Sequence, residues 1–384
     1  MKDLIYFDHA ATTAMHTDVL QAYVEVIGEG AGNPSSLHAQ GRAAREKVSK
    51  ARDALAGILN CDASELVFTG SGTESDNSAL FGAAYAQKKR GKNGIVTTAI
   101  EHHAVLNACR ELETQGFSLK ILPVDEYGRV SVEDAKAAIN EATAVVSIMA
   151  GNNETGTLQP IAEIGEWARK HKALMHVDAV QAFGYIDIDL REWPVDLLSL
   201  SAHKINGPQG VGLLYIRKGS PFQPLLYGGS QERSRRASTE NVAGIVAFAK
   251  AAELASIQRD ERREHAENVR STLLKELSEQ LGEQSFAVNG HPDDRLPHIV
   301  NISFVGISSA SMLMNLDLAG VAVSGGSACN SGSLKPSHVL SAMNISAERV
   351  SSAVRFSFGL GNTREQAEKT AKITATISAR LRNR

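Results

Sequence analysis

The stretch that decides the fold is Ser199-Leu-Ser-Ala-His-Lys-Ile-Asn-Gly-Pro-Gln-Gly210. The apolar run 195–200 predicts a buried strand, and 211–216 predicts a second strand after the stretch. The glycine–proline pair between them ends any continuation, so Lys204 lies in a short loop between two strands. Two interpretations are open at this point. Lys204 is either a solvated loop lysine or a desolvated amine that forms a Schiff base with a carbonyl cofactor.

Upstream of this stretch, apolar runs alternate with helical patterns from about residue 60 to residue 216. The expected strands are 66–69, 95–99, 144–149, 174–178, 195–200 and 211–216. This alternation is typical of a mostly parallel sheet with helices on its faces. A polar candidate stands at or just past the end of five strands: Thr73, His102, Asn153, Asp178 and Lys204. Ligands bind at the carboxyl ends of strands in such sheets, so we expect these side chains to lie together.

The first of these candidates belongs to a glycine-rich turn, Gly70-Ser-Gly-Thr73, which opens a helix to about residue 90. The unpaired N–H groups at such a helix start, together with the helix dipole, favour an anion, most simply a phosphate. No lysine follows the glycines, so the turn is not a P-loop. Ser75 stands where the dinucleotide fingerprint has its third glycine. An ordinary capped helix also explains the pattern.

Composition sets the broad class. The chain has 384 residues, of which 43% are hydrophobic and 22% charged, with a formal net charge of −3. This length predicts one large and one smaller domain, and the charge gives no case for direct nucleic acid binding. The N-terminus carries charge where a signal peptide needs an apolar core, and no run approaches the ~18 apolar residues of a membrane span. Three cysteines without C-x-x-C spacing argue against disulfides or structural zinc. We expect a soluble, cytoplasmic protein without a metal site.

The regular alternation weakens after residue 216. A long helical stretch, about 241–281, contains the charged run 259–270, which we expect to be a solvated face bridging two domains. Residues 298–304 and 354–358 alternate polar and apolar side chains, as half-exposed strands do. The second run places Arg355 opposite its aromatic face. The expected division is a large domain over 16–256 and a smaller α+β domain over 257–384, completed by residues 1–15.

The cysteines differ in their surroundings. Cys329 stands in Val323-Ser-Gly-Gly-Ser-Ala-Cys-Asn-Ser-Gly-Ser-Leu-Lys-Pro336, with almost nothing apolar beside it. This favours a reactive thiol over a buried structural one. Cys109 shares a helical face with apolar neighbours and is expected to be a core thiol, whereas the sequence assigns no role to Cys61.

Nine short motifs together carry a resemblance to a known family. They occur in order along nearly the whole chain: 8–13, 32–36, 72–77, 101–102, 152–154, 177–181, 201–204, 326–329 and 355–357. In this arrangement the chain resembles the cysteine desulfurases of the NifS/IscS type, which are pyridoxal-phosphate (PLP) enzymes of fold-type I in the class V aminotransferase family. The resemblance implies an α/β fold, with a large domain built on a mostly parallel, helix-covered sheet and a smaller α+β domain.

The resemblance also implies roles at the cofactor. Lys204 would bind the aldehyde of PLP as a Schiff base, Asp178 would pair with the pyridine nitrogen, and His102 would stack on the ring and move protons. Gln181 would contact the ring hydroxyl, and Asn153 would serve both cofactor and substrate. The phosphate would be held by Gly72, Thr73, Ser201 and His203, joined by Thr239 from the other subunit of a homodimer.

For the substrate, the resemblance implies that Arg355 clamps the carboxylate of L-cysteine, assisted by Asn153 and Asn33. Cys329 would attack the sulfur of the bound cysteine, which gives alanine and a persulfide. The persulfide sulfur would pass to an acceptor protein, either an iron–sulfur scaffold or a tRNA-thiolating enzyme.

Other interpretations remain. A selenocysteine lyase or an aminotransferase would use the same lysine and aspartate, although an aminotransferase has no need of Cys329. A non-catalytic sulfur-relay subunit would carry no PLP. An NAD enzyme is disfavoured by the incomplete glycine pattern.

Overall fold

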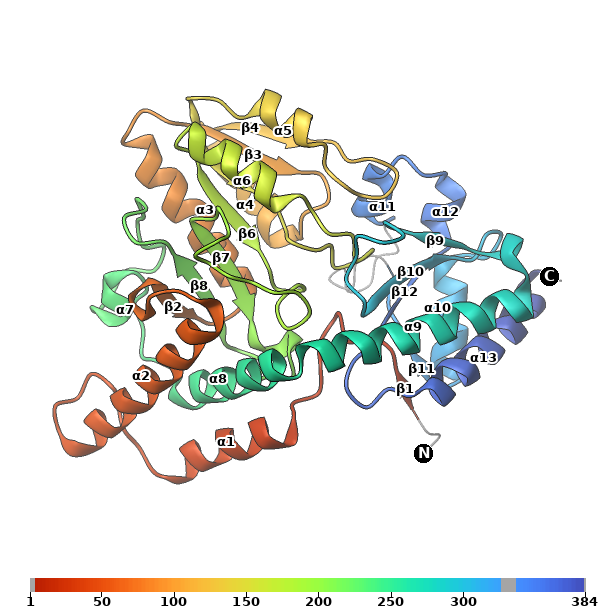
Figure 1. The fold of residues 1–384 in the computed structure, drawn as a ribbon, viewed down its shortest axis with the longest axis horizontal. Helices are drawn as coiled ribbons and strands as arrows, with labels where there is room; N and C mark the ends of the chain where they lie inside the picture. Colours follow the sequence, from red (N-terminus) through yellow and green to blue (C-terminus); the bar gives the residue numbers. More distant parts are fainter. Residues whose placement is uncertain (1–3, 326–335, 383–384) are drawn as a thin grey trace.

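The computed structural model describes residues 4–325 and 336–382, and its larger sheet has seven strands (Figure 1). In spatial order they are β2 (Leu66–Thr69), β8 (Gly212–Ile216), β7 (Leu197–Ser201), β6 (Leu174–Asp178), β5 (Thr143–Ser147), β3 (Gly94–Thr98) and β4 (Ser118–Leu122). Strand β8 is antiparallel to both of its neighbours, and the other pairs are parallel. The predicted mostly parallel sheet is therefore confirmed.

Helices cover both faces of this sheet, because alternate residues of each strand point to opposite sides. Val67 and Val145 enter one apolar cluster with α3 (Gly72–Lys88) and α4 (His103–Thr114), which also buries Cys109 as expected. Their neighbours Phe68 and Val146 enter another cluster. That cluster includes residues of α2 (Ala39–Leu59), α5 (Val132–Ala138), α6 (Ile161–Lys170) and α8 (Val242–Ile257), and α1 (Thr17–Gly28) supplies one buried valine.

A second, antiparallel sheet has the order β12 (Ala353–Ser357), β10 (Ile299–Ser303) and β9 (Ala287–Asn289). Its apolar side packs against α9 (Arg259–Leu281), α10 (Ser309–Leu318) and α13 (Arg364–Arg382). The N-terminal strand β1 (Ile5–Tyr6) pairs with β11 (Val321–Ala322) beside this sheet. The short elements are α7 (Gln231–Ser234), α11 (His338–Ala342), α12 (Ala347–Ser351) and the 3-10 helices Ala63–Glu65, Ala202–Lys204 and Glu283–Ser285.

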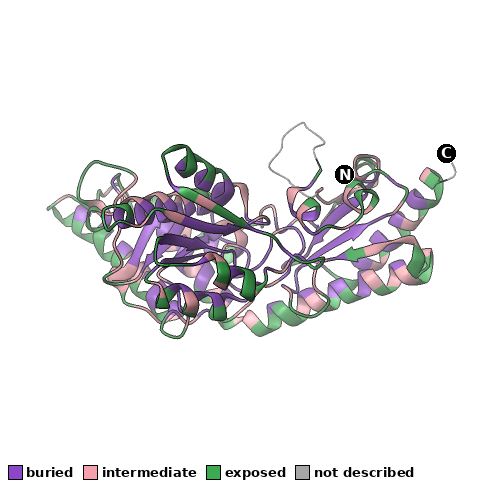
Figure 2. Ribbon diagram, turned by 90° about the horizontal axis from the view of Figure 1, so that it is seen from above, coloured by how far each residue is buried: buried purple, intermediate pink, exposed green. Residues whose placement is uncertain are grey.

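The predicted half-exposure of β10 and β12 is wrong, because every residue of both strands is buried. Their alternation separates two buried faces. Val354 and Phe356 face the apolar cluster, whereas Arg355 and Asn301 donate hydrogen bonds to backbone carbonyls of loop 153–154 of the larger sheet. The buried strands accordingly form two groups joined along the α8–α9 side (Figure 2).

The expected helical stretch 241–281 divides at Gln258 into α8 and α9. The expectation of a solvated charged run is wrong for Arg262 and Arg270, which are buried. Arg262 donates to Asn206 Oδ1 at 2.9 Å and lies over the ring of Tyr185, so its side chain packs against loops that connect strands of the larger sheet.

The predicted domain boundaries stay a prediction. The cluster of the larger sheet also contains Ala10, Ile299 and Val339, from regions assigned to the smaller domain. Within the described ranges, no helix is both long enough and apolar enough to cross a membrane.

Candidate active site

A cavity of about 370 Å³ lies where the carboxyl ends of the parallel strands meet the polar side of the smaller sheet. Ten residues predicted from the sequence line it: Gly72, Thr73, His102, Asn153, Asp178, Gln181, Ser201, His203, Lys204 and Arg355. The five strand-end candidates therefore lie together, as expected. Nine of the ten come from the larger sheet and its loops, whereas Arg355 comes from β12.

Three predicted residues are not part of this cavity. Asn33 is exposed in the loop before α2, where its Oδ1 accepts from Ser35 N at 2.9 Å. Thr239 lines a separate, smaller cavity with Gly210 and Arg236. Cys329 lies outside the described residues.

Lys204 ends the 3-10 helix that follows β7, and its position is defined by the N-terminal segment. Its Nζ donates to the carbonyls of Ala10 at 2.6 Å and Ala11 at 2.7 Å. The half-buried amine is thus held in a fixed place rather than extended into solvent. Sequence reasoning missed this contact, because nothing in the pattern around Lys204 indicates a segment almost 200 residues away.

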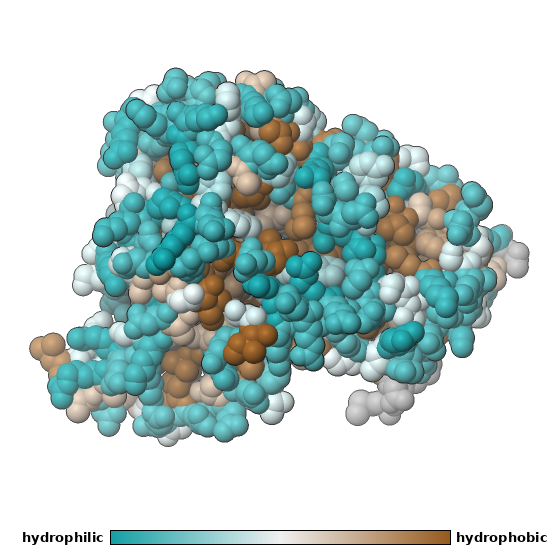
Figure 3. All heavy atoms as spheres, in the orientation of Figure 1, coloured by the Kyte–Doolittle hydropathy of each residue, from teal (hydrophilic) through white to brown (hydrophobic). Residues whose placement is uncertain are grey.

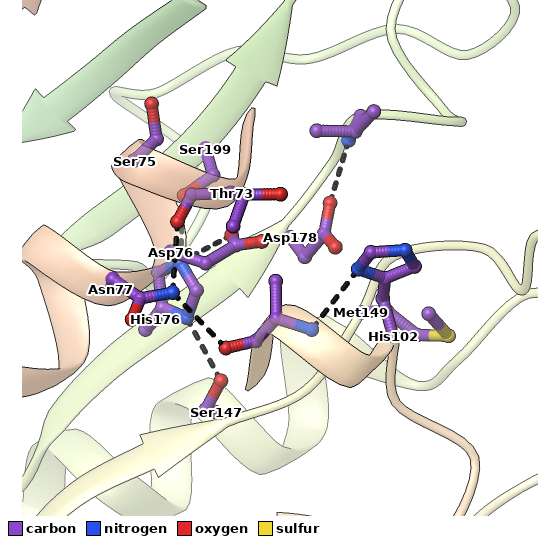
Figure 4. A network of polar contacts seen from close by, with 12 residues as sticks. Thr73, Ser75, Asp76, Asn77, His102, Ser147, Met149, His176, Asp178 and Ser199 are labelled. Atoms are coloured by element: carbon purple, nitrogen blue, oxygen red, sulfur yellow. Dashed lines mark hydrogen bonds and ion pairs between the residues drawn. The ribbon is translucent and has the colours of Figure 1, made fainter. Parts of the chain in front are cut away.

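Asp178 ends β6, and its carboxylate faces the cavity (Figure 4). Its Oδ1 accepts from Val180 N at 2.9 Å. Burial raises the pKa of Asp178 to about 6, while the Val180 N–H and the positive charge of Lys204 act in the opposite direction. Near neutral pH the carboxyl is therefore mostly ionised.

Behind Asp178 lies a buried polar group that sequence reasoning missed. His176 points to the same side of β6 as Asp178, and its ring nitrogens pair with Ser147 Oγ at 2.8 Å and Ser199 Oγ at 2.9 Å. Its Nε2 is 3.6 Å from Asp76 Oδ1. Burial lowers the pKa of His176 to about 3.

The carboxyl of Asp76 belongs to this same group. Burial and the neighbouring charge of Asp178 raise the pKa of Asp76 well above its usual range. The raised pKa of Asp76 and the lowered pKa of His176 both favour the uncharged form of the group, next to the carboxyl of Asp178. Two features of the sequence could have indicated this buried group. Asp76 lies within the 72–77 motif, and His176 stands two residues before Asp178, so both point to the same side of a strand.

His102 is the N-cap of α4, and its Nδ1 accepts from Ala104 N at 3.1 Å. The neutral ring therefore carries its proton on Nε2. Burial lowers the pKa of His102 to about 4, and the nearby charge of Lys204 lowers it further. An uncharged, buried imidazole of this kind is suited to lie against a planar ring.

The start of α3 forms the anion-binding end of the cavity. Ser71 caps the helix by accepting from Glu74 N at 3.1 Å. A Cβ on Gly72 would lie 3.0 Å from Val180 Cγ2 and 3.4 Å from Ser201 Cβ, so a side chain there would fill the space beside the helix start. Helix N–H groups, hydroxyls and the His203 imidazole surround this space, which suits a phosphate.

Arg355 forms the opposite end of the cavity, and its side chain is only 2% exposed. Nη1 donates to Asn153 O at 2.8 Å, and Nη2 pairs with Asp8 Oδ1 at 3.0 Å. Nε is buried and has no hydrogen-bond partner among the described residues. The Arg355 guanidinium, which lines the cavity, supplies positive charge at this end.

These groups match the chemical requirements of one cofactor. The cavity combines an amine for an aldehyde, a carboxylate for a pyridine nitrogen and a helix N-terminus for a phosphate. PLP requires this set, and the described residues contain no group of three His, Cys, Asp or Glu side chains suited to a metal ion. The fold and the cavity thus define a PLP-dependent enzyme.

Comparisons with known proteins identify the family. Residues 5–369 match the family model "Aminotransferase class-V". The chain is 48% identical to a putative cysteine desulfurase IscS 1 of Bacillus subtilis, over 98% of this chain and 99% of that protein. It is 44% identical to a cysteine desulfurase IscS of Dictyoglomus turgidum, over 100% of this chain and 96% of that protein. The solved structure of a NifS-like protein superimposes with a TM-score of 0.91 at 38% identity, covering 98% of this chain and 99% of the other.

The chain belongs to the class V aminotransferase family, among the PLP-dependent cysteine desulfurases of the NifS/IscS type. The resemblance drawn from the nine motifs is confirmed. The roles of the individual residues stay predictions.

Proposed function

We propose that the protein is a cysteine desulfurase that converts L-cysteine to L-alanine and takes the sulfur onto Cys329 as a persulfide. The observation that carries the proposal is a single cavity that joins Lys204 and Asp178 with the buried guanidinium of Arg355. In the reaction, the Cβ–S bond of the substrate breaks and an S–S bond to Cys329 forms. The bond-forming thiol lies outside the described residues, so its assignment rests on the resemblance.

At one end of the cavity, the chain's groups would hold PLP. When bound, PLP supplies an electron sink that makes the Cα–H of an amino acid acidic. Lys204 supplies the amine for its aldehyde, and Asp178 keeps its ring nitrogen protonated. The shifts of the pKa values of Asp76 and His176 favour the uncharged form of both groups behind Asp178.

Proton movement is assigned to Lys204 and His102. The Ala10 and Ala11 carbonyls fix the position of Lys204 Nζ, and the Ala104 N–H fixes the ring of His102 with its proton on Nε2. Positioned acid–base groups of this kind typically contribute 10²–10⁴-fold. The guanidinium of Arg355 holds the substrate carboxylate, with Asn153 beside it in the cavity lining.

The proposal also includes a cytoplasmic homodimer that delivers sulfur to an iron–sulfur scaffold or a tRNA-thiolating enzyme. Two observations support association. Thr239, expected to complete a phosphate site, lies outside the main cavity of its own chain. Helix α1 also exposes Leu20, Val24 and Ile27, which are spaced as one apolar face.

The test follows alanine release and sulfur attachment when the PLP-loaded protein is given L-cysteine. Cys329→Ser should retain the PLP absorption band but lose alanine release by about 10²-fold or more. Mass spectrometry of the parent should find one added sulfur on Cys329. Cys61→Ser is the matched control, because burial raises the pKa of the Cys61 thiol to about 12 and leaves it unreactive. A ketoacid product, or the added sulfur on Cys61, would contradict the proposal.

A further inference from the structure

The glycine-rich turn at the start of α3 holds a carboxylate beside the proposed phosphate site. Glu74 lies in the first turn of the helix, and its Oε2 accepts from Gly70 N at 2.7 Å. A helix N-terminus favours negative charge, so this carboxylate and a phosphate bound at Gly72 share one helix start. Two negative charges so close repel each other, and the binding of the phosphate is weakened unless a positive charge offsets the carboxylate.

Arg236 supplies this positive charge. Its Nε donates to Glu74 Oε1 at 2.7 Å and its Nη2 donates to Glu74 Oε2 at 3.2 Å, which makes the pair bidentate. The two side chains are 17% and 20% exposed, so water screens them less than it screens an ordinary surface pair. Because Glu74 is also held by the N–H of Gly70, the position of its carboxylate does not depend on Arg236 alone.

The ion pair and the phosphate site lie beside two glycines of the same turn. A Cβ on Gly70 would be 2.7 Å from Glu74 Oε2 and 3.8 Å from Arg236 Nη2, whereas a Cβ on Gly72 would enter the space at the main cavity. The Cα atoms of the two glycines are at most about 7.6 Å apart, because only two residue steps separate them. Within its own chain, Arg236 lines the smaller cavity and not the main one, so it acts on the phosphate by its charge rather than by contact.

The segment that carries Arg236 has a strained backbone. Residues 232–234 have φ values of 46°, 56° and 61°, a left-handed region that residues other than glycine rarely adopt. The buried carboxylate of Glu232 accepts from Arg52 Nη1 at 2.8 Å and Nη2 at 2.7 Å, and also from Phe68 N at 3.0 Å. Strain of this kind persists only where the surroundings impose it, and it gathers at functional sites. The contacts of Glu232 thus fix the segment four residues before Arg236.

We propose that Arg236 is a positioning residue for the phosphate of PLP, which neutralises Glu74 and so leaves the N-terminus of α3 to the phosphate. The effect is electrostatic and acts through Glu74. The inference rests on the proposed placement of the phosphate at Gly72. It goes beyond the proposed reaction, because it concerns how the cofactor is retained and not where the sulfur goes.

The test compares two ligands that differ only by a phosphate group. PLP carries it, and pyridoxal is the same aldehyde with a free hydroxyl in its place. The full chain is freed of PLP with hydroxylamine, and both dissociation constants are measured from the absorption band that each ligand forms on binding. Arg236→Gln should weaken PLP about tenfold relative to pyridoxal, because one negative charge at the turn is then unbalanced. Arg236→Lys retains the positive charge and should stay within about threefold of the parent.

Glu74→Gln separates this electrostatic role from a merely structural one. The amide keeps an acceptor for the N–H of Gly70 but removes the negative charge. Alone, Glu74→Gln should tighten PLP several-fold relative to pyridoxal, because the charge of Arg236 is then unbalanced. Combined with Arg236→Gln, it should restore PLP binding to within about threefold of the parent. Arg233→Gln is the matched control, because it removes the same charge from an exposed position of the same segment, and it should leave the binding of both ligands unchanged.

Equal losses for PLP and pyridoxal in Arg236→Gln would overturn the inference, because they would indicate general damage to the cavity. A double variant as weak as Arg236→Gln would overturn it as well, since the loss would then not act through Glu74. If Arg236→Gln does not fold, Glu74→Gln alone decides, and unchanged PLP binding in that variant overturns the inference. Failure of the proposed function is a different result, in which the PLP-loaded parent releases no alanine from L-cysteine.

Discussion

The two sheets supply functional side chains in different ways. In the larger sheet, both faces are apolar and covered by helices, and the polar groups stand where strands end. In the smaller sheet, one face is apolar and the other carries polar side chains within the strands, with Arg355 at the centre of β12. Figure 4 shows the polar group of the larger sheet from close by. Asp178 and His176 lie on one strand, and Asp76 lies beside them on α3.

The surface view adds that hydrophobic side chains come to the exterior between hydrophilic ones mainly as separate groups (Figure 3). The polar side of the smaller sheet is buried and is not an outer surface. This side forms a wall of the cavity. The alternation of polar and apolar residues along its strands therefore serves the cavity, because it places polar side chains there. A polar–apolar repeat does not by itself indicate solvent on the polar side.

The largest effect should come from the strand-end group. Asp178→Asn removes the negative charge that faces the cavity, and loss of one member of a buried charge pair costs about 2–5 kcal/mol. Alanine release should fall by about 10²-fold or more. Asp76→Asn is the matched change, because burial and the charge of Asp178 raise the pKa of Asp76 and so favour its uncharged form, and it should lower the rate no more than about threefold. Similar losses in the two variants would show that charge at Asp178 is not what matters.

An intermediate effect is expected on the smaller sheet. Arg355→Lys replaces a planar fork with a single ammonium group, so it loses the bidentate geometry while it retains the positive charge. The apparent KM for L-cysteine should rise about 10–150-fold, and PLP should remain bound. Steady-state kinetics with a PLP absorption spectrum measures both. An unchanged KM would place the carboxylate site elsewhere in the cavity.

The smallest effect concerns stability against pH. Burial raises the pKa of Glu101 to about 8, although Thr98 Oγ1 donates to its Oε1 at 2.6 Å. A carboxyl whose pKa is raised by folding stabilises the protein below its unfolded pKa, about 4.3, and this stability is lost as pH rises toward 8. Glu101→Gln does not titrate, so its Tm should decline less between pH 5 and 8.

For a chain of 384 residues, the difference in Tm decline should be about 1–2 °C for each kcal/mol involved. Thermal unfolding of the protein without PLP at several pH values measures it, and Glu46→Gln, at an exposed helix position, is the control. A parallel decline in parent and Glu101→Gln would mean that another group governs the alkaline loss of stability.

Much of the larger sheet was predictable because its signals are local. Strands 66–69 and 174–178 were predicted with the observed bounds, and the polar residues after strand ends were brought together by topology alone. A local signal of another kind is the capping box between Thr363 and Gln366 at the start of α13.

The parts of the site that escaped prediction depend on contacts between distant segments. Asp8 and Arg355 are 347 residues apart, and no periodicity in either segment refers to the other. The buried polar group behind Asp178 forms only where α3 packs across β6. Apart from the 72–77 motif, the sequence therefore does not indicate that Asp76 belongs to this group. Asn33 and Thr239 were expected from the resemblance, and within one chain neither reaches the main cavity.

The N-terminal turn of residues 8–12 has a consequence for the order of folding. Strand β1 pairs with β11, more than 300 residues later, and Asp8 completes its contacts only with Ser324 and β12. During synthesis, the N-terminal residues therefore cannot form these contacts until nearly the whole chain has been made. Pairings of such long sequence separation form slowly. Because the same turn fixes Lys204, a ribosome-bound or C-terminally truncated chain should be unable to retain PLP, even when its larger sheet has already formed.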